Sequence, residues 1–289
     1  MKYLTAPLCI ALCLVALPAP ASPGDEPEKQ ASSEGQVEIA PEAMPANDDD
    51  QDDDDAARYA ALPPDPPPEI NEIKAGRRLF LRKCKDCHGR NGGGDGPVSS
   101  FMDPRPRDLR RGVYKLRSTE TGTLPTDWDL FRTVTRGVPG TSMPGWRGLS
   151  RADRWRIVGY IKSLSKRFVE EADEPRLPLQ IQITTLESES AIERGSKVYD
   201  LMQCGTCHGE TGRGDGPAAK SLRDERNRRI YPFDMTQAWK LKTGSSMRDL
   251  VRVFYTGLDG TPMPSYADTL TPEQASDLAF FVRSLSATN

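Results

Sequence analysis

The sequence "LRKCKDCHGRNGGGDGP" at residues 81–97 returns with changes as "MQCGTCHGETGRGDGP" at residues 202–217. Further matches keep the same offset of 120 residues: "TSMPGW" at 141–146 corresponds to "TPMPSY" at 261–266. "PRDL" at 106–109 corresponds to "PFDM" at 232–235 after a loop of different length. An internal repeat of this length predicts two domains of one fold in this chain of 289 residues.

Each copy contains the pattern Cys-x-x-Cys-His, which is typical of covalent attachment of a c-type haem. The two cysteines bond to the haem, and the histidine places its imidazole on one side of the iron. The alternatives are a disulfide or half of a zinc site. A disulfide gives no reason for a histidine in both copies, and zinc would need the two motifs to meet across 120 residues. We therefore predict two covalently bound haem c groups, held by Cys84, Cys87, His88, Cys204, Cys207 and His208.

Methionine is the expected ligand on the other side of each iron, because the chain has no third histidine. Only Met143 and Met263 occupy equivalent positions, each 55 residues after its histidine and each followed by proline. A single methionine is more often a core filler, but the matched spacing favours ligation. The predicted metal ligands are His88 and Met143 in one copy and His208 and Met263 in the other, and we predict no catalytic residue.

The apolar residues recur with helical spacing, and strand patterns are nearly absent, so each domain is predicted to be mostly helical. An amphipathic helix leads into each cysteine pair, a middle helix ends at a glycine, and a last helix follows the methionine loop. The predicted helix signals are, in chain order, Thr126 to Gly137, a capping box of Ser190 with Glu193, Ser246 to Gly257, and an N-cap at Thr271 followed by Pro272.

On the markers "CKDCH" with "TSMP" and "CGTCH" with "TPMP", the chain resembles the class I cytochromes c, arranged as a tandem dihaem protein over residues 72–168 and 189–286. The resemblance implies an all-α fold of two small helical bundles, each wrapped around a haem. It implies aromatic contacts where the first and last helices cross, Phe80 with Tyr160 and Tyr199 with Phe281. It further implies that the carbonyls of Pro97 and Pro217 accept a hydrogen bond from the ligating imidazoles.

Several other side chains are candidates for the haem propionates. Trp146, Tyr266, Trp239 and Tyr114 are either propionate donors or packed aromatic residues. Arg105, Arg107 and Arg110 either face the propionates or belong to a solvated basic surface.

Histidine and methionine together saturate the iron, and a saturated iron suits electron transfer because no position has to open for a substrate. The sequence therefore predicts an electron-transfer protein that passes single electrons between redox partners, rather than an enzyme. The alternatives are a dihaem peroxidase-like enzyme, a redox sensor whose methionine dissociates, and the cytochrome subunit of a larger respiratory oxidoreductase.

The predicted organisation begins with a signal peptide, which favours a periplasmic protein, although an uncleaved N-terminal anchor is the alternative. Next comes an acidic, proline-rich segment with the composition of a disordered tail. The predicted boundaries are 1–21 signal peptide, 22–70 tail, 71–170 first domain, 171–188 linker and 189–289 second domain.

Charge differs sharply between these parts. Lys and Arg against Asp and Glu number 2 to 15 in residues 22–70, 22 to 10 in residues 71–170 and 14 to 17 in residues 171–289. We expect redox partner proteins, with an acidic partner or a peripheral contact with an anionic membrane at the first domain, and no nucleic acid. The acidic tail is either a spacer or a competitor for the basic domain.

Overall fold

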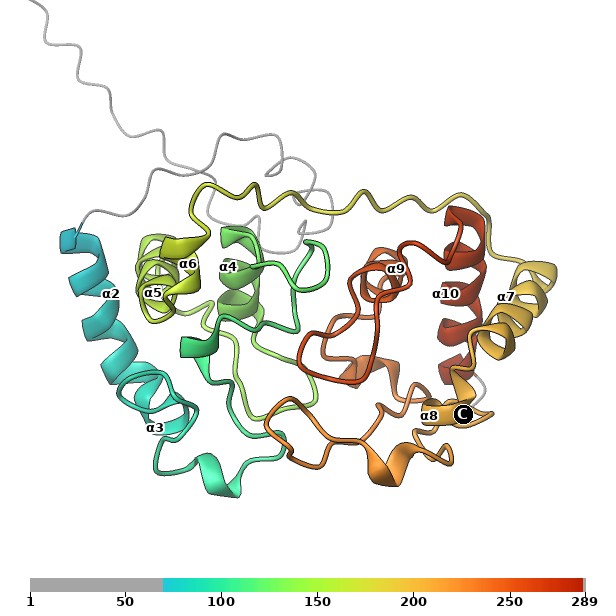
Figure 1. Cartoon of the computed structure of the whole chain (residues 1–289), viewed down its shortest axis with the longest axis horizontal. Helices are drawn as coiled ribbons and strands as arrows, with labels where there is room; N and C mark the ends of the chain where they lie inside the picture. Colours follow the sequence, from blue (N-terminus) through green and yellow to red (C-terminus); the bar gives the residue numbers. More distant parts are fainter. Residues whose placement is uncertain (1–69, 288–289) are drawn as a thin grey trace, which may run out of the picture. The chain divides into compact units, whose positions relative to one another are not determined.

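Both repeats fold as bundles of α-helices joined by loops and short 3-10 turns (Figure 1). The computed structural model describes residues 70–287, so the predicted leader and nearly all of the predicted acidic tail lie outside the described residues. Within residues 70–287 there is no strand, only an isolated bridge between Arg223 and Arg229. The predicted all-α fold is confirmed.

The elements of the two repeats correspond in order. The first repeat contains α2 (Ile70–Lys83), α3 (Lys85–His88), η2 (Ser99–Phe101), η3 (Leu109–Arg111), α4 (Asp127–Arg136), α5 (Arg151–Ser163) and α6 (Arg167–Glu170). The second repeat contains α7 (Glu189–Leu201), α8 (Gly205–His208), η4 (Ala219–Ser221), η5 (Ala238–Lys240), α9 (Met247–Thr256) and α10 (Pro272–Ala287). Thus α2, α3, η2, α4 and α5 match α7, α8, η4, α9 and α10.

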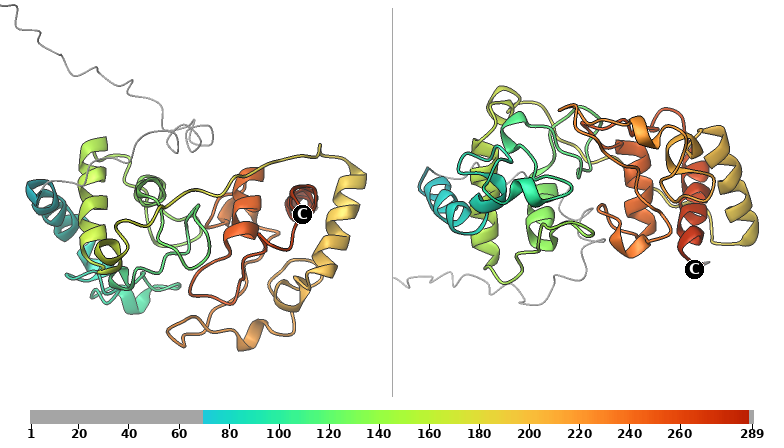
Figure 2. Two further views of the ribbon diagram at one scale, coloured as in Figure 1. Left: turned by 45° about the horizontal axis from the view of Figure 1, so that its top comes forward. Right: turned by 90° about the horizontal axis from the view of Figure 1, so that it is seen from below.

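The first helix of each repeat crosses the helix that follows the methionine loop in direct contact, α2 with α5 and α7 with α10 (Figures 1 and 2). The predicted aromatic pairs lie at the crossings, because the ring centroids of Phe80 and Tyr160, and those of Tyr199 and Phe281, are each 5.2 Å apart in edge-on geometry. Such pairs are worth about 0.5–1.5 kcal/mol beyond the area that they bury. The expected crossing contacts are present in both repeats.

Glycines permit these close crossings. A Cβ on Gly76 would lie 1.9 Å from the carbonyl oxygen of Arg156, and one on Gly195 would lie 2.1 Å from that of Asp277. Gly76 precedes Phe80 by four residues, and Gly195 precedes Tyr199 by four, so each glycine lies on the same helix face as the aromatic residue of the crossing. The crossing therefore depends on main chain packed against main chain.

The second repeat has one more residue than the first between the crossing aromatic residue and the cysteine. In the first repeat the Cys84 amide donates to the Phe80 carbonyl four residues back, at 2.8 Å, whereas the Cys204 amide donates to the Tyr199 carbonyl five residues back, at 3.0 Å. Gln203 takes up the extra residue with φ of 56°. A wider helical turn thus leaves the crossing geometry unchanged.

Most of the predicted helix ends are confirmed. Thr126 and Ser246 cap α4 and α9, and the C-caps are Gly137 and Gly257. Thr271 and Gln274 form the reciprocal capping bonds of α10, at 3.0 and 3.2 Å.

The capping box predicted for the second cysteine helix was wrong. Ser188 caps α7 instead, since its hydroxyl accepts from the Ala191 amide at 3.1 Å, and Ser190 lies within the first turn of the helix. Serines two residues apart both precede the apolar stretch, so composition alone did not distinguish them.

Residues 171–187 link the repeats and run along both of them. The Leu179 amide donates to the Ser118 carbonyl at 2.8 Å, and the Thr184 amide donates to the Ser276 hydroxyl at 3.1 Å. Ile181 packs against the core of the second repeat, whereas Ile183 is 38% exposed.

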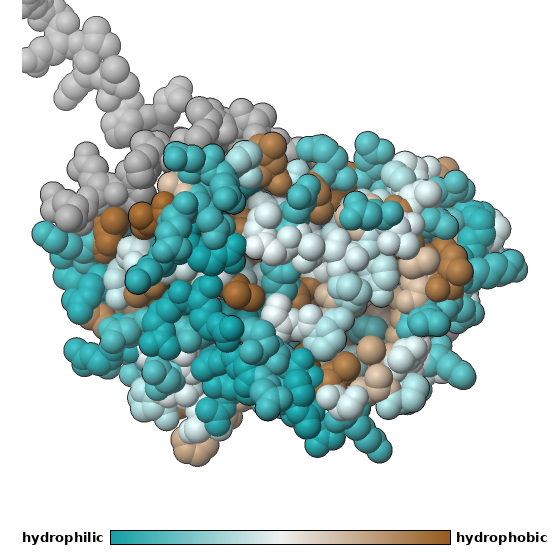
Figure 3. All heavy atoms as spheres, in the orientation of Figure 1, coloured by the Kyte–Doolittle hydropathy of each residue, from teal (hydrophilic) through white to brown (hydrophobic). Residues whose placement is uncertain are grey.

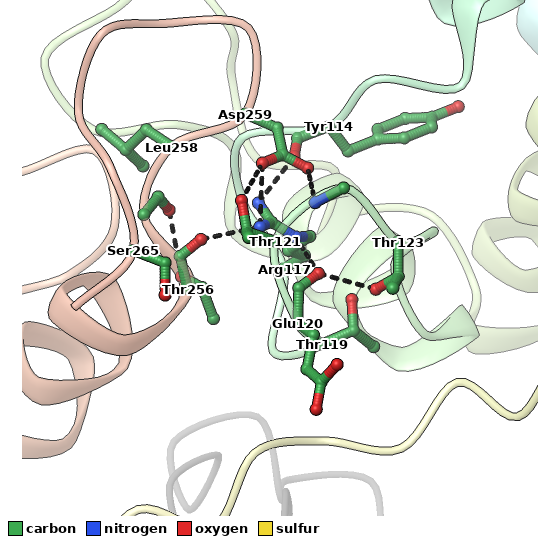
Figure 4. A network of polar contacts seen from close by, with 12 residues as sticks. Tyr114, Arg117, Thr119, Glu120, Thr121, Thr123, Thr256, Leu258, Asp259 and Ser265 are labelled. Atoms are coloured by element: carbon green, nitrogen blue, oxygen red, sulfur yellow. Dashed lines mark hydrogen bonds and ion pairs between the residues drawn. The ribbon is translucent and has the colours of Figure 1, made fainter. Parts of the chain in front are cut away.

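Both repeats lie in one compact unit, and arginines of the first repeat meet carboxylates of the second. The fully buried Arg117 side chain pairs with Asp259 at 2.9 Å and donates to the Thr256 carbonyl at 2.7 Å (Figure 4). Its guanidinium also donates to the main-chain carbonyls of Tyr114 and Glu120 in its own repeat. The further pairs between the repeats are Arg132 with Asp249, Arg107 with Glu225 and Arg111 with Glu225.

The basic surplus of the first repeat is therefore partly used within the molecule. Four of its arginines pair with three carboxylates of the second repeat, although hydrophilic side chains still gather over much of the first repeat (Figure 3). Carboxylates of the second repeat thus neutralise part of the positive charge of the first repeat.

Acid should weaken the Asp249 contacts. Burial raises the pKa of this carboxyl, but Arg252, Arg132 and the Ser246 hydroxyl outweigh burial and hold the pKa below its usual value. A carboxyl with a lowered pKa stabilises the folded state fully above its unfolded pKa of about 3.9, and the contribution is lost as pH falls through the folded value.

Replacing Asp249 by Asn should cost about 3 kcal/mol at pH 7, because two buried arginines lose their counter-ion. Urea unfolding from pH 7 down to pH 3 should show the difference from the wild type shrinking below about pH 4. The exposed Asp268→Asn is the control and should unfold like the wild type at every pH. A cost for Asp249→Asn that does not change with pH would contradict this account.

Candidate functional site

Each Cys-x-x-Cys-His motif forms a single helical turn at the end of the first helix of its repeat. The His88 amide donates to the Cys84 carbonyl at 2.8 Å, and the His208 amide donates to the Cys204 carbonyl at 2.9 Å. All four cysteines are free and half-buried. Burial, with help from the neighbouring cysteine, raises the pKa of Cys84 to about 12, and burial raises that of Cys204 to about 11. An uncharged thioether sulfur suits such sites, because a thiolate would be poorly solvated there.

The two imidazoles are oriented in the same way. The Nδ1 atom of His88 lies 3.4 Å from the carbonyl oxygen of Arg107, and that of His208 lies 3.3 Å from the carbonyl oxygen of Phe233. Burial lowers the pKa of both histidines, while the carbonyl contacts oppose this in part. A neutral imidazole that donates from Nδ1 has Nε2 free to bind a metal.

The expectation that Pro97 and Pro217 accept these bonds was wrong. Both prolines are exposed and follow glycines that pack against the cysteine turn, where Gly96 and Gly216 donate to the carbonyls of Cys87 and Cys207, at 3.2 Å each. The "PRDL" and "PFDM" segments come beneath the imidazoles instead. They are held there because Leu109 and Met235 donate to the carbonyls of Gly92 and Gly212, at 2.8 and 2.7 Å.

The two methionine loops have the same hydrogen bonds. The Met143 carbonyl accepts from the Val138 amide and the Met263 carbonyl from the Leu258 amide, at 3.1 Å each. The Met143 and Met263 amides donate to the hydroxyls of Thr141 and Thr261, at 3.1 and 3.2 Å. Both methionines are half-buried.

Each methionine loop rests on the glycine that ends the middle helix. Gly137 and Gly257 have φ of 71° and 61°, and a Cβ on either would lie within 2.7 Å of the main chain of the loop. Glycine is needed for both the backbone angle and the close approach.

A cavity of 860 Å³, called the second cavity below, brings together the predicted haem residues of the second repeat and is also lined by residues of the first. Cys204, Cys207, His208 and Met263 all line it, and Leu250, Phe254, Leu278 and Val282 provide apolar wall. The volume falls within the range of about 300–1,000 Å³ that is usual for cofactor sites. The thiols, the oriented imidazole, the thioether and the apolar wall fit a covalently attached haem.

The aromatic and arginine candidates divide. Tyr266 lines the cavity, whereas Trp239 is 70% exposed and does not. Trp146 packs against the core of the first repeat, and Tyr114 is buried with its hydroxyl on the Leu109 carbonyl at 3.4 Å. Arg105 and Arg107 line the second cavity, whereas Arg110 pairs with Asp108 in its own repeat.

Some residues that connect two helices or the two repeats were not predicted from the sequence. The helix-crossing glycines could have been found, because Gly76 and Gly195 hold the same place in the repeat. The buried Arg117 and the cavity residues Lys115 and Lys242 had no such signal, since each works across the boundary between the repeats.

Both repeats match known families. Residues 71–161 match the family described as cytochrome C oxidase, cbb3-type, subunit III, and residues 192–286 match the family described as cytochrome c. The chain is 25% identical over 219 residues to the Cbb3-type cytochrome c oxidase subunit FixP of Azorhizobium caulinodans. That match covers 73% of this chain and 58% of FixP, so the chain spans less than two thirds of this relative.

A solved structure extends the likeness to three dimensions. A chain of the reducing HAO-like protein complex of Kuenenia stuttgartiensis is 40% identical, with a TM-score of 0.70, over 73% of this chain and 96% of that one. These matches confirm the predicted tandem of two cytochrome domains. The chain therefore belongs to the c-type cytochromes, with two cytochrome c domains in tandem that carry covalently bound haem c.

Proposed function

We propose that this chain is a dihaem electron-transfer cytochrome in which His88 and Met143 ligate one iron and His208 and Met263 ligate the other. The main support is the duplicated geometry of the sites: the imidazoles lie 3.4 and 3.3 Å from matched carbonyls, and both methionine loops rest on a glycine. Each domain would hold its haem through one cysteine pair, Cys84 with Cys87 and Cys204 with Cys207.

A bound haem would supply reversible one-electron chemistry, and the cysteine pair and histidine of each repeat would hold it in place. The chain's residues hold the group in place and exclude water. The carbonyls of Arg107 and Phe233 orient the imidazoles, and the apolar wall of Leu250, Phe254 and Leu278 limits solvent access.

The two relatives support the proposal that this chain functions as part of a larger protein assembly. One is a subunit of an oxidase by name and the other belongs to a protein complex, which agrees with an electron-transfer component rather than an enzyme. We propose that the chain exchanges electrons with redox partner proteins, one of them acidic at the first domain or reached through an anionic membrane surface. A peroxidase-like enzyme is less well supported, because both repeats retain a methionine at the matched position.

We also propose that the protein is periplasmic and that its domains have the boundaries expected from the sequence. The proposed limits are a leader at 1–21, a tail at 22–70, domains at 71–170 and 189–289 and a linker at 171–188. None of the helices within residues 70–287 has the length and apolar character needed to cross a membrane.

The methionine ligands can be tested one at a time. Met143→Ala and Met263→Ala should each remove about half of the weak far-red sulfur-to-iron absorption of the oxidised protein and lower the potential of one haem, because a nitrogen–sulfur ligand pair favours the ferrous state. Each variant should also bind cyanide at one iron.

Met102 and Met235 provide the matched controls, because they also line the second cavity but neither has a methionine at the corresponding position of the other repeat. Replacement of either by Leu should keep the full absorption. An unchanged spectrum in Met143→Ala or Met263→Ala would show that another residue ligates that iron.

A further inference from the structure

The first repeat forms one side of the second cavity. Residues 102–108, Lys115 and Gly140 line it, together with the cysteine turn and methionine loop of the second repeat. Seven of the lining side chains are cationic: Arg105, Arg107, Lys115, Arg226, Arg228, Arg229 and Lys242. The second haem site is therefore incomplete without the first repeat.

Four carboxylates around this cavity already accept hydrogen bonds, and a fifth, Asp103, lines the cavity and interacts electrostatically with Lys242. Asp108 accepts from the Arg110 guanidinium, Asp224 from two main-chain amides, and Asp234 from the side chains of Thr236 and Gln237. Glu225 accepts from Arg107 at 3.2 Å. Glu225 and Asp224 attract Lys115, and Asp103 attracts Lys242, but none of these carboxylates forms a direct ion pair with either lysine.

Lys115 and Lys242, one from each repeat, carry positive charge that these carboxylates compensate only in part. Neither ammonium makes a hydrogen bond or an ion pair among residues 70–287, although both are half-buried. Burial lowers the pKa of Lys115 to about 8, with further lowering by Arg107 and Lys242 and partial opposition from Glu225 and Asp224. Burial also lowers the pKa of Lys242, which Asp103 opposes in part. Partly buried cations that repel each other cost free energy unless an anion joins them.

A haem carries two propionate carboxylates at one edge, so the group that fits the rest of this cavity also provides the missing anions. We propose that Arg107, Lys115 and Lys242 bind the propionates of the second haem, so that the first repeat completes the second haem site. This inference rests on the proposed function, because it requires a haem in this cavity.

Arg107 would then link the two haem sites. Its carbonyl oxygen lies 3.4 Å from the Nδ1 atom of His88, and the residue lines the second cavity, with its guanidinium paired to Glu225 at 3.2 Å. The same residue orients the imidazole of the first site and adds positive charge to the second.

Loss of a cation at this place should change the potential of the second haem. A ferric iron carries one more positive charge than a ferrous iron, so removal of a nearby cation stabilises the ferric state and lowers the potential. For Lys115→Met we expect about a tenfold change in the reduction equilibrium of the second haem, which equals about 59 mV for one electron. The potential of the first haem should move less.

The test is redox titration of the full-length holoprotein, with the haems assigned through Met143→Ala and Met263→Ala. Lys115→Met and Lys242→Met should both lower the potential of the second haem, and Lys115→Arg, which keeps the charge, should retain it. Lys166→Met, an exposed residue that does not line the cavity, is the control for loss of one positive charge.

Two results would overturn the inference. One is a second-haem potential in Lys115→Met and Lys242→Met that equals that of Lys166→Met while the far-red absorption is intact. The other is a shift of the wild-type potential on addition of phosphate at constant ionic strength, which would mean that the cluster binds an external anion. Absence of the far-red absorption from the wild type would instead refute the proposed ligation.

Discussion

Replacing Arg117 by methionine should lower the free energy of unfolding by about 3–5 kcal/mol, the usual cost of removing one partner of a buried ion pair. Its side chain has no exposed surface, and it pairs with Asp259 at 2.9 Å. The carbonyls of Thr256, Tyr114 and Glu120 lose a donor at the same time. Methionine fills part of the volume but satisfies none of these acceptors.

Urea unfolding of the holoprotein measures this cost. A double-mutant cycle with Asp259→Asn should give a coupling energy above about 1 kcal/mol, because the two side chains touch. The control is Arg283→Met, which removes an arginine paired with Glu187 at the surface, where side chains are 38% and 53% exposed. That variant should cost about 1 kcal/mol or less. A cost for Arg117→Met as small as that of the control would contradict a structural role between the repeats.

Replacing Gly195 by alanine should destabilise the second domain by about 2 kcal/mol or more, although this exchange normally stabilises a helix by about 0.5–1 kcal/mol. The new Cβ would lie 2.1 Å from the Asp277 carbonyl oxygen and 2.8 Å from the Phe281 Cβ. The helices must separate to admit it. Separation would weaken the Tyr199–Phe281 contact and shift the cysteine turn that follows α7.

Chemical unfolding and the far-red absorption together measure this effect. Gly76→Ala should have the same effect on the first domain, since its Cβ would lie 1.9 Å from the Arg156 carbonyl oxygen. Gly148→Ala is the matched control, because nothing lies within 4 Å of its Cβ position, and its stability should change by less than about 1 kcal/mol. If Gly195→Ala proved as stable as Gly148→Ala, the close main-chain packing of α7 and α10 would be disproved.

Local chemistry made much of this protein predictable from its sequence. The helix ends at Gly137 and Gly257 follow from residues that are adjacent in the chain, as does the N-cap at Thr271. Comparison of the two copies extended the prediction over longer distances, because Phe80 with Tyr160 and Tyr199 with Phe281 hold matched places. The ligand assignment of Met143 and Met263 rests on the same symmetry and stays a prediction.

The carbonyl that orients each imidazole depended on the path of a loop. Arg107 and Phe233 come beneath the histidines because their segments bond to Gly92 and Gly212, whereas the sequence pattern pointed to Pro97. Loop length differs between the copies here, so no spacing rule was available.

The sequence by itself determined two haem-binding helical domains, because each domain is formed by a contiguous stretch of residues and the same motifs occur in both stretches. Only the tertiary structure decided how the repeats depend on each other, through Arg117 with Asp259 and through Lys115 at the second cavity. A contact between the repeats has no counterpart within either copy, so neither periodicity nor internal symmetry predicts it. The net charges of the parts indicated attraction, but the pairing of individual charges required their positions in space.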